Sequence, residues 1–167
     1  MNARLAPAVR RRAMAVRDID AVVLVEASAY GFPWTRGNFV DSLAAGYVAE
    51  LMENEAGEVL GYFLAMTGVD ELHLLNITVA PAWQGLGLGR RLMADLEAQA
   101  RALRVASVWL EVRASNLRAR SLYERLGYTA VGLRKAYYPA VGRREDAVVM
   151  SLPLPDEDAA GAPHALD

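Results

Sequence analysis

Hydrophobic residues recur at helical spacing near the start of the chain and predict two helices there. Apolar positions fall on one side of a helix over residues 18–29, which Asp18 is placed to cap and which a Gly-Phe-Pro sequence ends. Thr35 is a suitable cap for a second helix, which ends at Gly46. The residues before the first helix, 13–17, predict a short strand.

The spacing of apolar residues then changes to a pattern typical of strands. Residues 47–52 and 59–66 are rich in β-forming residues, and the polar, glycine-containing segment between them is typical of a hairpin turn. A third such run covers residues 72–79. The three runs predict an antiparallel meander.

A long amphipathic helix is predicted from near Leu88. Leu92, Leu96 and Ala100 recur at helical spacing, while charged residues occupy the opposite face. The apolar run at 105–112 predicts the strand that follows.

The last third of the chain adds one helix and two strands. Asn116 is placed to cap a helix that Gly127 ends, and residues 128–133 and 147–152 predict the strands. The complete order, β-α-α-β-β-β-α-β-α-β-β, predicts an α+β fold with a mixed sheet.

The size of the chain suits one domain. It has 167 residues, of which 54% are hydrophobic, enough for a real core. We expect a single domain over residues 13–154. Residues 1–12, including the basic run from Arg10 to Arg12, predict a flexible arm, and residues 155–167 predict a disordered acidic tail.

Charge and residue usage exclude several classes of function. The net charge of -2 and the pI near 5.7 give no reason to expect direct nucleic-acid binding. The absence of cysteine excludes a disulfide framework, a thiolate zinc site and a cysteine nucleophile, and no metal site is expected. No apolar run approaches the roughly 20 residues of a membrane span, and charged residues interrupt the first 20 positions, so we expect no signal peptide there. We therefore expect a cytoplasmic protein without membrane contact.

A glycine-rich segment connects the third strand of the meander to the long helix: Gln84-Gly85-Leu86-Gly87-Leu88-Gly89-Arg90. Glycines at alternate positions remove side chains where phosphates must approach the backbone. The unpaired amides of the first helical turn then point at those phosphates. The segment predicts a phosphate-bearing ligand.

Two nucleotide-binding motifs fit this segment less well. It is not a Walker loop, because no Gly-Lys-Ser/Thr follows. A dinucleotide fingerprint would require a third glycine where Arg90 stands. A tight turn between strand and helix, without any ligand, stays open as the plain alternative.

Together with later segments, the glycine-rich segment resembles the GNAT superfamily of acetyl-CoA-dependent N-acetyltransferases. Gln84-x-x-Gly87-x-Gly89 matches the Gln/Arg-x-x-Gly-x-Gly/Ala pyrophosphate motif of that family, and the resemblance covers about residues 14–154. It implies the GNAT fold, a mixed α/β three-layer arrangement in which helices flank a mixed central sheet. The segments similar to the RimI branch in particular are 32–34, 111–116, Tyr123, 134–139 and 142–147.

The resemblance implies acetyl-CoA as cosubstrate. Backbone groups of Ile77, Thr78 and Val79 would hold the pantetheine arm, and an amide there would polarise the thioester carbonyl. The segment Gln84 to Arg90 would hold the pyrophosphate. The side chain of Asn116, which its position alone makes a helix cap, would contact the CoA arm.

Acyl transfer to an amine requires the ammonium group to lose a proton and the departing thiolate to gain one. The resemblance assigns these tasks to Glu111 as proton acceptor and Tyr123 as proton donor, with no covalent acyl-enzyme. By residue type alone, Glu111 is more often a surface carboxylate and Tyr123 a packed helix residue whose hydroxyl seeks a partner. His73 is expected to be a strand residue without a catalytic role.

The RimI branch acetylates the N-terminal α-amine, typically of an alanine, in a small-subunit ribosomal protein. The resemblance therefore implies a ribosomal protein N-terminus as acceptor, with direct attack in a ternary complex. Residues 137–139 and 32–34 would wall the acceptor channel. The alternatives are a GNAT enzyme acting on another N-terminus, a lysine or a small amine, and a non-catalytic module that binds CoA or a protein partner.

Overall fold

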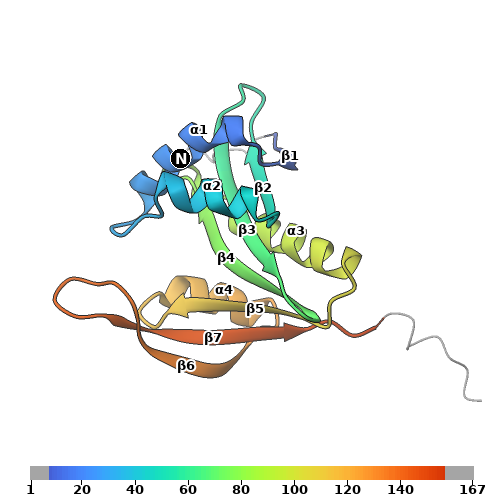
Figure 1. The fold of residues 1–167 in the computed structure, drawn as a ribbon, viewed down its shortest axis with the longest axis vertical. Helices are drawn as coiled ribbons and strands as arrows, with labels where there is room; N and C mark the ends of the chain where they lie inside the picture. The colour runs from blue at the N-terminus through green and yellow to red at the C-terminus, as the bar shows by residue number, and fades with distance from the viewer. Residues whose placement is uncertain (1–7, 157–167) are drawn as a thin grey trace, which may run out of the picture.

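The computed structural model describes residues 8–156, and its central feature is a seven-stranded mixed sheet (Figure 1). The strand order is β1-β2-β3-β4-β5-β7-β6, and every neighbouring pair is antiparallel except β4 with β5. The strands are β1 (Arg10–Ala13), β2 (Val48–Glu53), β3 (Val59–Thr67), β4 (Glu71–Val79), β5 (Ser107–Arg113), β6 (Thr129–Tyr138) and β7 (Glu145–Pro153).

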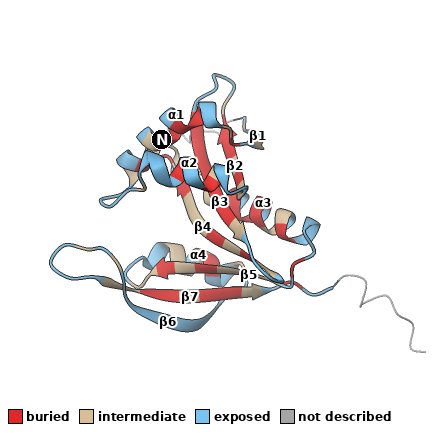
Figure 2. Ribbon diagram, in the orientation of Figure 1, coloured by how far each residue is buried: buried red, intermediate tan, exposed pale blue. Residues whose placement is uncertain are grey.

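Helices pack on both faces of this sheet and bury its centre, which Figure 2 shows in red. Two helices cover β2 and β3 on one face, where Phe39 and Tyr62 are fully buried, and two cover the other face, where Leu92 and Leu96 are buried. The predicted α+β fold is confirmed. The first pair is α1 (Ile19–Ala29) and α2 (Arg36–Ala44), and the second pair is α3 (Leu88–Ala102) and α4 (Leu117–Arg125).

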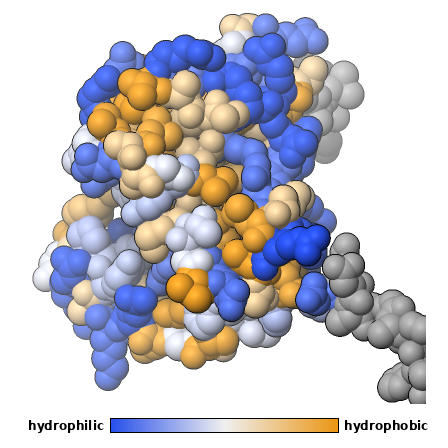
Figure 3. All heavy atoms as spheres, turned by 45° about the vertical axis from the view of Figure 1, so that its right-hand side comes forward, coloured by the Kyte–Doolittle hydropathy of each residue, from blue (hydrophilic) through white to orange (hydrophobic). Residues whose placement is uncertain are grey.

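The parallel pair β4 and β5 is short. Residues Glu71–Leu74 pair with Ser107–Leu110, and beyond these residues the two strands separate (Figure 1). The pairing of β3 with β4 is irregular at the same level, between Leu64 and Ala65. The sheet therefore has a gap between the second half of β4 and the end of β5. On the face shown in Figure 3, hydrophobic residues gather near the middle of the molecule.

The predictions for the N-terminus need correction. The predicted strand at 13–17 is wrong, because β1 ends at Ala13 and a 3-10 turn, Val16–Asp18, follows. The predicted flexible arm is wrong at Arg10 to Arg12, which form most of β1. Residues 1–7 of the arm and 157–167 of the acidic tail lie outside the described residues.

Ion pairs explain why three consecutive arginines form a strand. Arg10 and Arg12 both contact the carboxylate of buried Glu53, and Arg11 contacts Asp95 of α3. Arg12 also binds Asp18, whose carboxylate accepts a hydrogen bond from the amide of Ala15, 2.7 Å away. Asp18 therefore braces the turn before α1 and does not cap the helix by its side chain.

The other helix caps agree with the sequence. The hydroxyl of Thr35 accepts a hydrogen bond from the amide of Asn38, and Oδ1 of Asn116 accepts one from Ala119. β6 extends five residues beyond the predicted end at 133, because a bulge between Arg134 and Tyr138 lets the strand continue.

Candidate active site

The glycine-rich segment follows β4 and a 3-10 turn, and it begins α3 as expected. Gly85 and Gly87 have φ angles of 79° and 81°, in the left-handed region that favours glycine. Gly87 caps α3, so the amides of the first turn of this helix point into the space beside it. These are the features of an anion site at a helix N-terminus.

The sequence did not predict the contacts of two side chains at this segment, those of Gln84 and Arg118. The side-chain amide of Gln84 donates to the carbonyl of Val79 at 3.1 Å, so Gln84 ties the loop to the end of β4. A methyl group built on Gly85 would lie 4.0 Å from Nη2 of Arg118, on α4. Arg118 therefore adds a positive charge next to the glycine-rich segment. This proximity results from the packing of α4 beside that segment and was not evident from the sequence.

The free edge of β4 presents two of the three predicted backbone contacts. The amide of Ala80 donates to the carbonyl of Leu60 in β3 at 2.8 Å, and backbone groups of successive strand residues point to opposite edges. The backbone groups of Ile77 and Val79 therefore face the gap, where no strand pairs with them. The carbonyl of Ile77 accepts a hydrogen bond there from the hydroxyl of Tyr30 at 2.9 Å, and that of Val79 accepts the one from Gln84. Those of Thr78 face β3, where Thr78 pairs with Tyr62.

A cleft of about 610 Å³ opens at the gap between β4 and β5, and we call it the central cleft. It brings together four residues predicted for the site: Ile77, Glu111, Asn116 and Tyr123. Residues of the two predicted channel walls also line it, namely Phe32, Trp34, Tyr138 and Pro139. The glycine-rich segment is not part of its lining; that segment lies at the start of α3, beside α4.

Glu111 reaches the central cleft because of strand alternation. Val108, Leu110 and Val112 point into the core beneath α3 and α4, so Glu111 and Arg113 point to the opposite face of β5. The side chain of Glu111 is 7% exposed.

Both oxygens of the Glu111 carboxylate have partners. Oε2 lies 2.5 Å from Nε2 of His73, and Oε1 lies 3.3 Å from Nε of Arg134. His73, expected to be a strand residue without a catalytic role, thus contacts the candidate proton acceptor. The pairing of β4 with β5, which sets this contact, was not evident from the sequence.

Tyr123 lies on the opposite side of the sheet from Glu111, on α4, and its side chain is almost fully buried beside Tyr128. Burial raises the pKa of its hydroxyl well above the ordinary value, so the group keeps its proton at neutral pH. No hydrogen bond links this hydroxyl to any other residue within 8–156. A ligand atom in the cleft would supply the missing partner.

Glu26 is a buried carboxylate that the sequence did not single out. It accepts hydrogen bonds from the hydroxyl of Tyr62 at 2.5 Å, from the amide of Trp34 at 3.0 Å and from the side chain of Asn76 at 3.2 Å. It fixes the loop after α1 against β3 and β4. Burial and this carboxylate raise the pKa of Tyr62.

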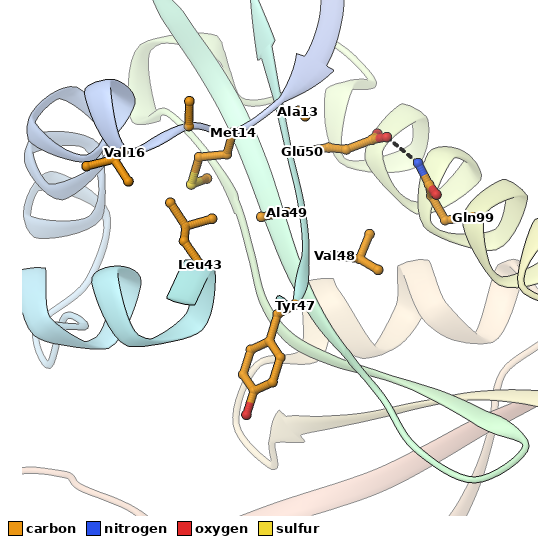
Figure 4. A pocket seen from close by; sticks show the side chains of 10 residues that line it. Ala13, Met14, Val16, Leu43, Tyr47, Val48, Ala49, Glu50 and Gln99 are labelled. Carbon is orange, nitrogen blue, oxygen red and sulfur yellow. Dashed lines mark hydrogen bonds between the residues drawn. The ribbon is translucent and has the colours of Figure 1, made fainter. Parts of the chain in front are cut away.

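A second hollow, of about 420 Å³, lies beside the start of β2. In Figure 4, Met14 and Leu43 lie on one side of the strand, and on the other side Gln99 of α3 donates a hydrogen bond to Glu50. Its one carboxylate is already paired, so we assign it no chemistry. Within residues 8–156, no three acidic or histidine side chains are grouped as for a metal ion, and no helix is long and apolar enough to cross a membrane.

Comparisons with known proteins agree with this geometry. The model of the acetyltransferase (GNAT) family matches residues 19–128. The [ribosomal protein bS18]-alanine N-acetyltransferase of Escherichia coli K12 is 38% identical over 138 residues, which are 82% of this chain and 92% of that protein.

Solved structures show the same fold. The crystal structure of the ribosomal-protein-S18-alanine N-acetyltransferase from Escherichia coli has a TM-score of 0.84 at 33% identity, over 96% of this chain and 99% of that chain. A phosphinothricin acetyltransferase from Sinorhizobium meliloti, solved in complex with AcCoA, has a TM-score of 0.75 at 20% identity, over 95% of each chain. The chain belongs to the acetyltransferase (GNAT) family.

Proposed function

We propose that this protein transfers the acetyl group of acetyl-CoA to the N-terminal α-amine of a protein, and that its acceptor is the N-terminal alanine of a small-subunit ribosomal protein. One observation carries the reaction: Glu111 and Tyr123 approach the same cleft from opposite faces of the sheet, at the gap where β4 offers its free edge. The name of the relatives, ribosomal protein bS18-alanine N-acetyltransferase, supports the acceptor.

Acetyl-CoA supplies a thioester, whose carbonyl carbon accepts the amine and whose sulfur leaves as thiolate. Three groups of this chain would hold it. The backbone amides of Ile77 and Val79, at the edge of β4 that no strand covers, would hold the pantetheine arm. The amides from Gly85 to Arg90 would hold the pyrophosphate, and Asn116, in the cleft lining, would contact the arm. The cation of Arg118, next to Gly85, adds to the phosphate site.

Glu111 takes one proton from the acceptor ammonium, which frees the nitrogen lone pair for attack on the thioester carbonyl carbon. An α-amine has an ordinary pKa of about 7.7 to 8.0, so a carboxylate is a sufficient base near neutral pH. An amide of the β4 edge stabilises the negative charge that develops on the carbonyl oxygen. The C–S bond then breaks, and Tyr123 gives its proton to the thiolate. The attacking nitrogen still carries two hydrogens after the attack, and its second proton passes through solvent to the tyrosinate, so that the products are the neutral amide and the CoA thiol.

The test is a panel of acceptors offered with acetyl-CoA. We expect release of CoA with peptides that carry the ribosomal N-terminus of the same organism, and mass spectrometry should place the acetyl group on the α-amine. Turnover confined to lysine side chains, polyamines or amino acids would instead support a GNAT enzyme of another specificity. Calorimetric binding of CoA without turnover on any amine would support a non-catalytic module.

A further inference from the structure

One residue of the central cleft, Arg113, contacts both of its walls. Its guanidinium lies 4.7 Å from the ring centroid of Tyr138, at the end of β6, and 6.0 Å from that of Phe32, in the loop after α1. Its Nη1 donates to the carbonyl of Pro139 at 2.9 Å. These two walls are separated by more than a hundred residues in sequence, and Arg113 stands between them at the end of β5.

Arg113 is itself held in place. Nη1 lies 3.2 Å from Oε2 of Glu145, at the start of β7, and Oε1 of the same carboxylate accepts a hydrogen bond from the amide of Ser115 at 2.8 Å. The bonds from Ser115 and Arg113 hold the pKa of Glu145 below its usual range, so this carboxylate is charged at neutral pH. The ion pair fixes the direction of the guanidinium toward the two aromatic rings.

Phe32 would otherwise be weakly held, because this residue is 48% exposed. Tyr138 is the half-buried last residue of β6, a strand that is otherwise exposed at the edge of the sheet, and its ring also packs against Tyr137. A planar guanidinium stacks on aromatic faces and donates to a carbonyl in a fixed geometry at the same time, whereas an ammonium group has donors but no planar group to stack. The geometry points to a specific use of arginine at this position.

We propose that Arg113 is a positioning residue for the acceptor: it fixes the distance between the Phe32 wall and the Tyr138–Pro139 wall, and thereby sets the affinity for an acceptor peptide that enters between them. This inference rests on the proposed function, since it takes the central cleft as the acceptor channel. It assigns Arg113 no contact with acetyl-CoA and no proton transfer.

Substitutions of Arg113 test this assignment by their separate effects on the two substrates. Arg113→Ala should raise the KM for an acceptor peptide about tenfold, the loss expected for one charge-assisted hydrogen bond and a cation–π contact, while the KM for acetyl-CoA stays within about twofold. Arg113→Lys should not restore acceptor affinity, because lysine keeps the charge without the planar group. Arg125→Ala is the matched control, since within residues 8–156 the side chain of Arg125 donates only to the carbonyl of Ser121 on its own helix.

A second measurement needs no turnover. Hydrogen exchange of the amides in residues 31–34 and 138–144 should accelerate together in Arg113→Ala, and should stay at the wild-type rate in Arg125→Ala. An unchanged acceptor KM, full recovery by lysine, an equal rise in the KM for acetyl-CoA, or unchanged exchange in both loops would overturn the proposal. A wild-type protein that acetylates no N-terminal peptide would overturn the proposed function, and the exchange measurement would then decide the role of Arg113 alone.

Discussion

Nε2 of His73 lies 2.5 Å from Oε2 of Glu111, so the carboxylate that we propose as proton acceptor is held by the neighbouring strand of the parallel pair. His73 aligns with Trp109 in the register of β4 and β5, and Glu111 follows two residues later on the same face. The contact exists because the two strands are still close at this level, just before they separate.

Replacement of His73 tests the importance of this contact. His73→Ala should lower kcat about fivefold to tenfold, because the carboxylate loses a hydrogen-bond partner that fixes its orientation. His73→Gln, which retains a donor of similar reach, should recover part of the loss. Steady-state kinetics with saturating acetyl-CoA provide the measurement, and a wild-type kcat in His73→Ala would show that Glu111 does not need this partner.

Glu111→Gln and Tyr123→Phe should each lower kcat by about 10²-fold to 10⁴-fold, the usual contribution of a positioned acid or base. Both substitutions preserve shape, so the dissociation constant for acetyl-CoA should stay within about twofold. Calorimetry and steady-state kinetics separate the two effects. Unchanged rates would remove the assigned roles from these residues.

Gly87→Ala should destabilise the protein by about 1–2 kcal/mol, because Gly87 has a φ of 81° and the left-handed conformation is unfavourable for alanine by about this amount. The substitution should also weaken acetyl-CoA binding, since it changes the cap of α3. Gly37→Ala is the control: Gly37 lies in α2 with an ordinary φ, and an added methyl group meets only Thr35 at 3.6 Å. Urea unfolding that showed equal effects at the two positions would contradict the argument.

The ion pairs of β1 predict loss of stability in acid. Hydrogen bonds from Arg12 hold the pKa of Asp18 and of Glu53 below their ordinary values of 3.8 and 4.5. A carboxyl group whose pKa is lowered by folding stabilises the protein above its ordinary pKa, and that contribution disappears as the pH falls through the lowered value. Thermal unfolding should therefore show a decline of Tm that sets in below pH 4.5 and continues past pH 3.8.

Asp18→Asn should have a lower Tm at neutral pH and a smaller decline in acid than the wild type, because the titrating partner of Arg12 is gone. Asp41→Asn, an exposed position on α2, provides the comparison. An equal decline of Tm with falling pH in wild type and Asp18→Asn would show that the ion pairs of Arg12 do not cause the loss of stability in acid.

The sequence predicted the elements whose signals are local. Thr35 and Asn116 act as caps where expected, and the glycine-rich segment begins α3, because capping and left-handed turns depend on a few neighbouring residues. β1 was missed because its arginines are stabilised by Glu53 and Asp95, which lie far along the chain.

In the candidate site, too, the contacts between residues far apart in the chain were the ones that the sequence did not predict. Glu111, Tyr123 and Ile77 meet in one cleft, as the family resemblance implied, although their chemical roles stay predictions. The contacts of His73, Glu26 and Arg118 depend on strand register and helix packing. Residue type alone carries no signal for such contacts.

The register of β5 also decides which chemistry the cleft contains. Four aligned pairs with β4 and seven with β7 hold this strand, and Glu111 itself is aligned with Val149 of β7. Side chains alternate along a strand, so a slip of one residue would turn Glu111 into the core and bring an apolar neighbour such as Leu110 to the acceptor side. The pairing of β5 with both of its neighbours therefore selects a base rather than a leucine at the point where the amine would arrive.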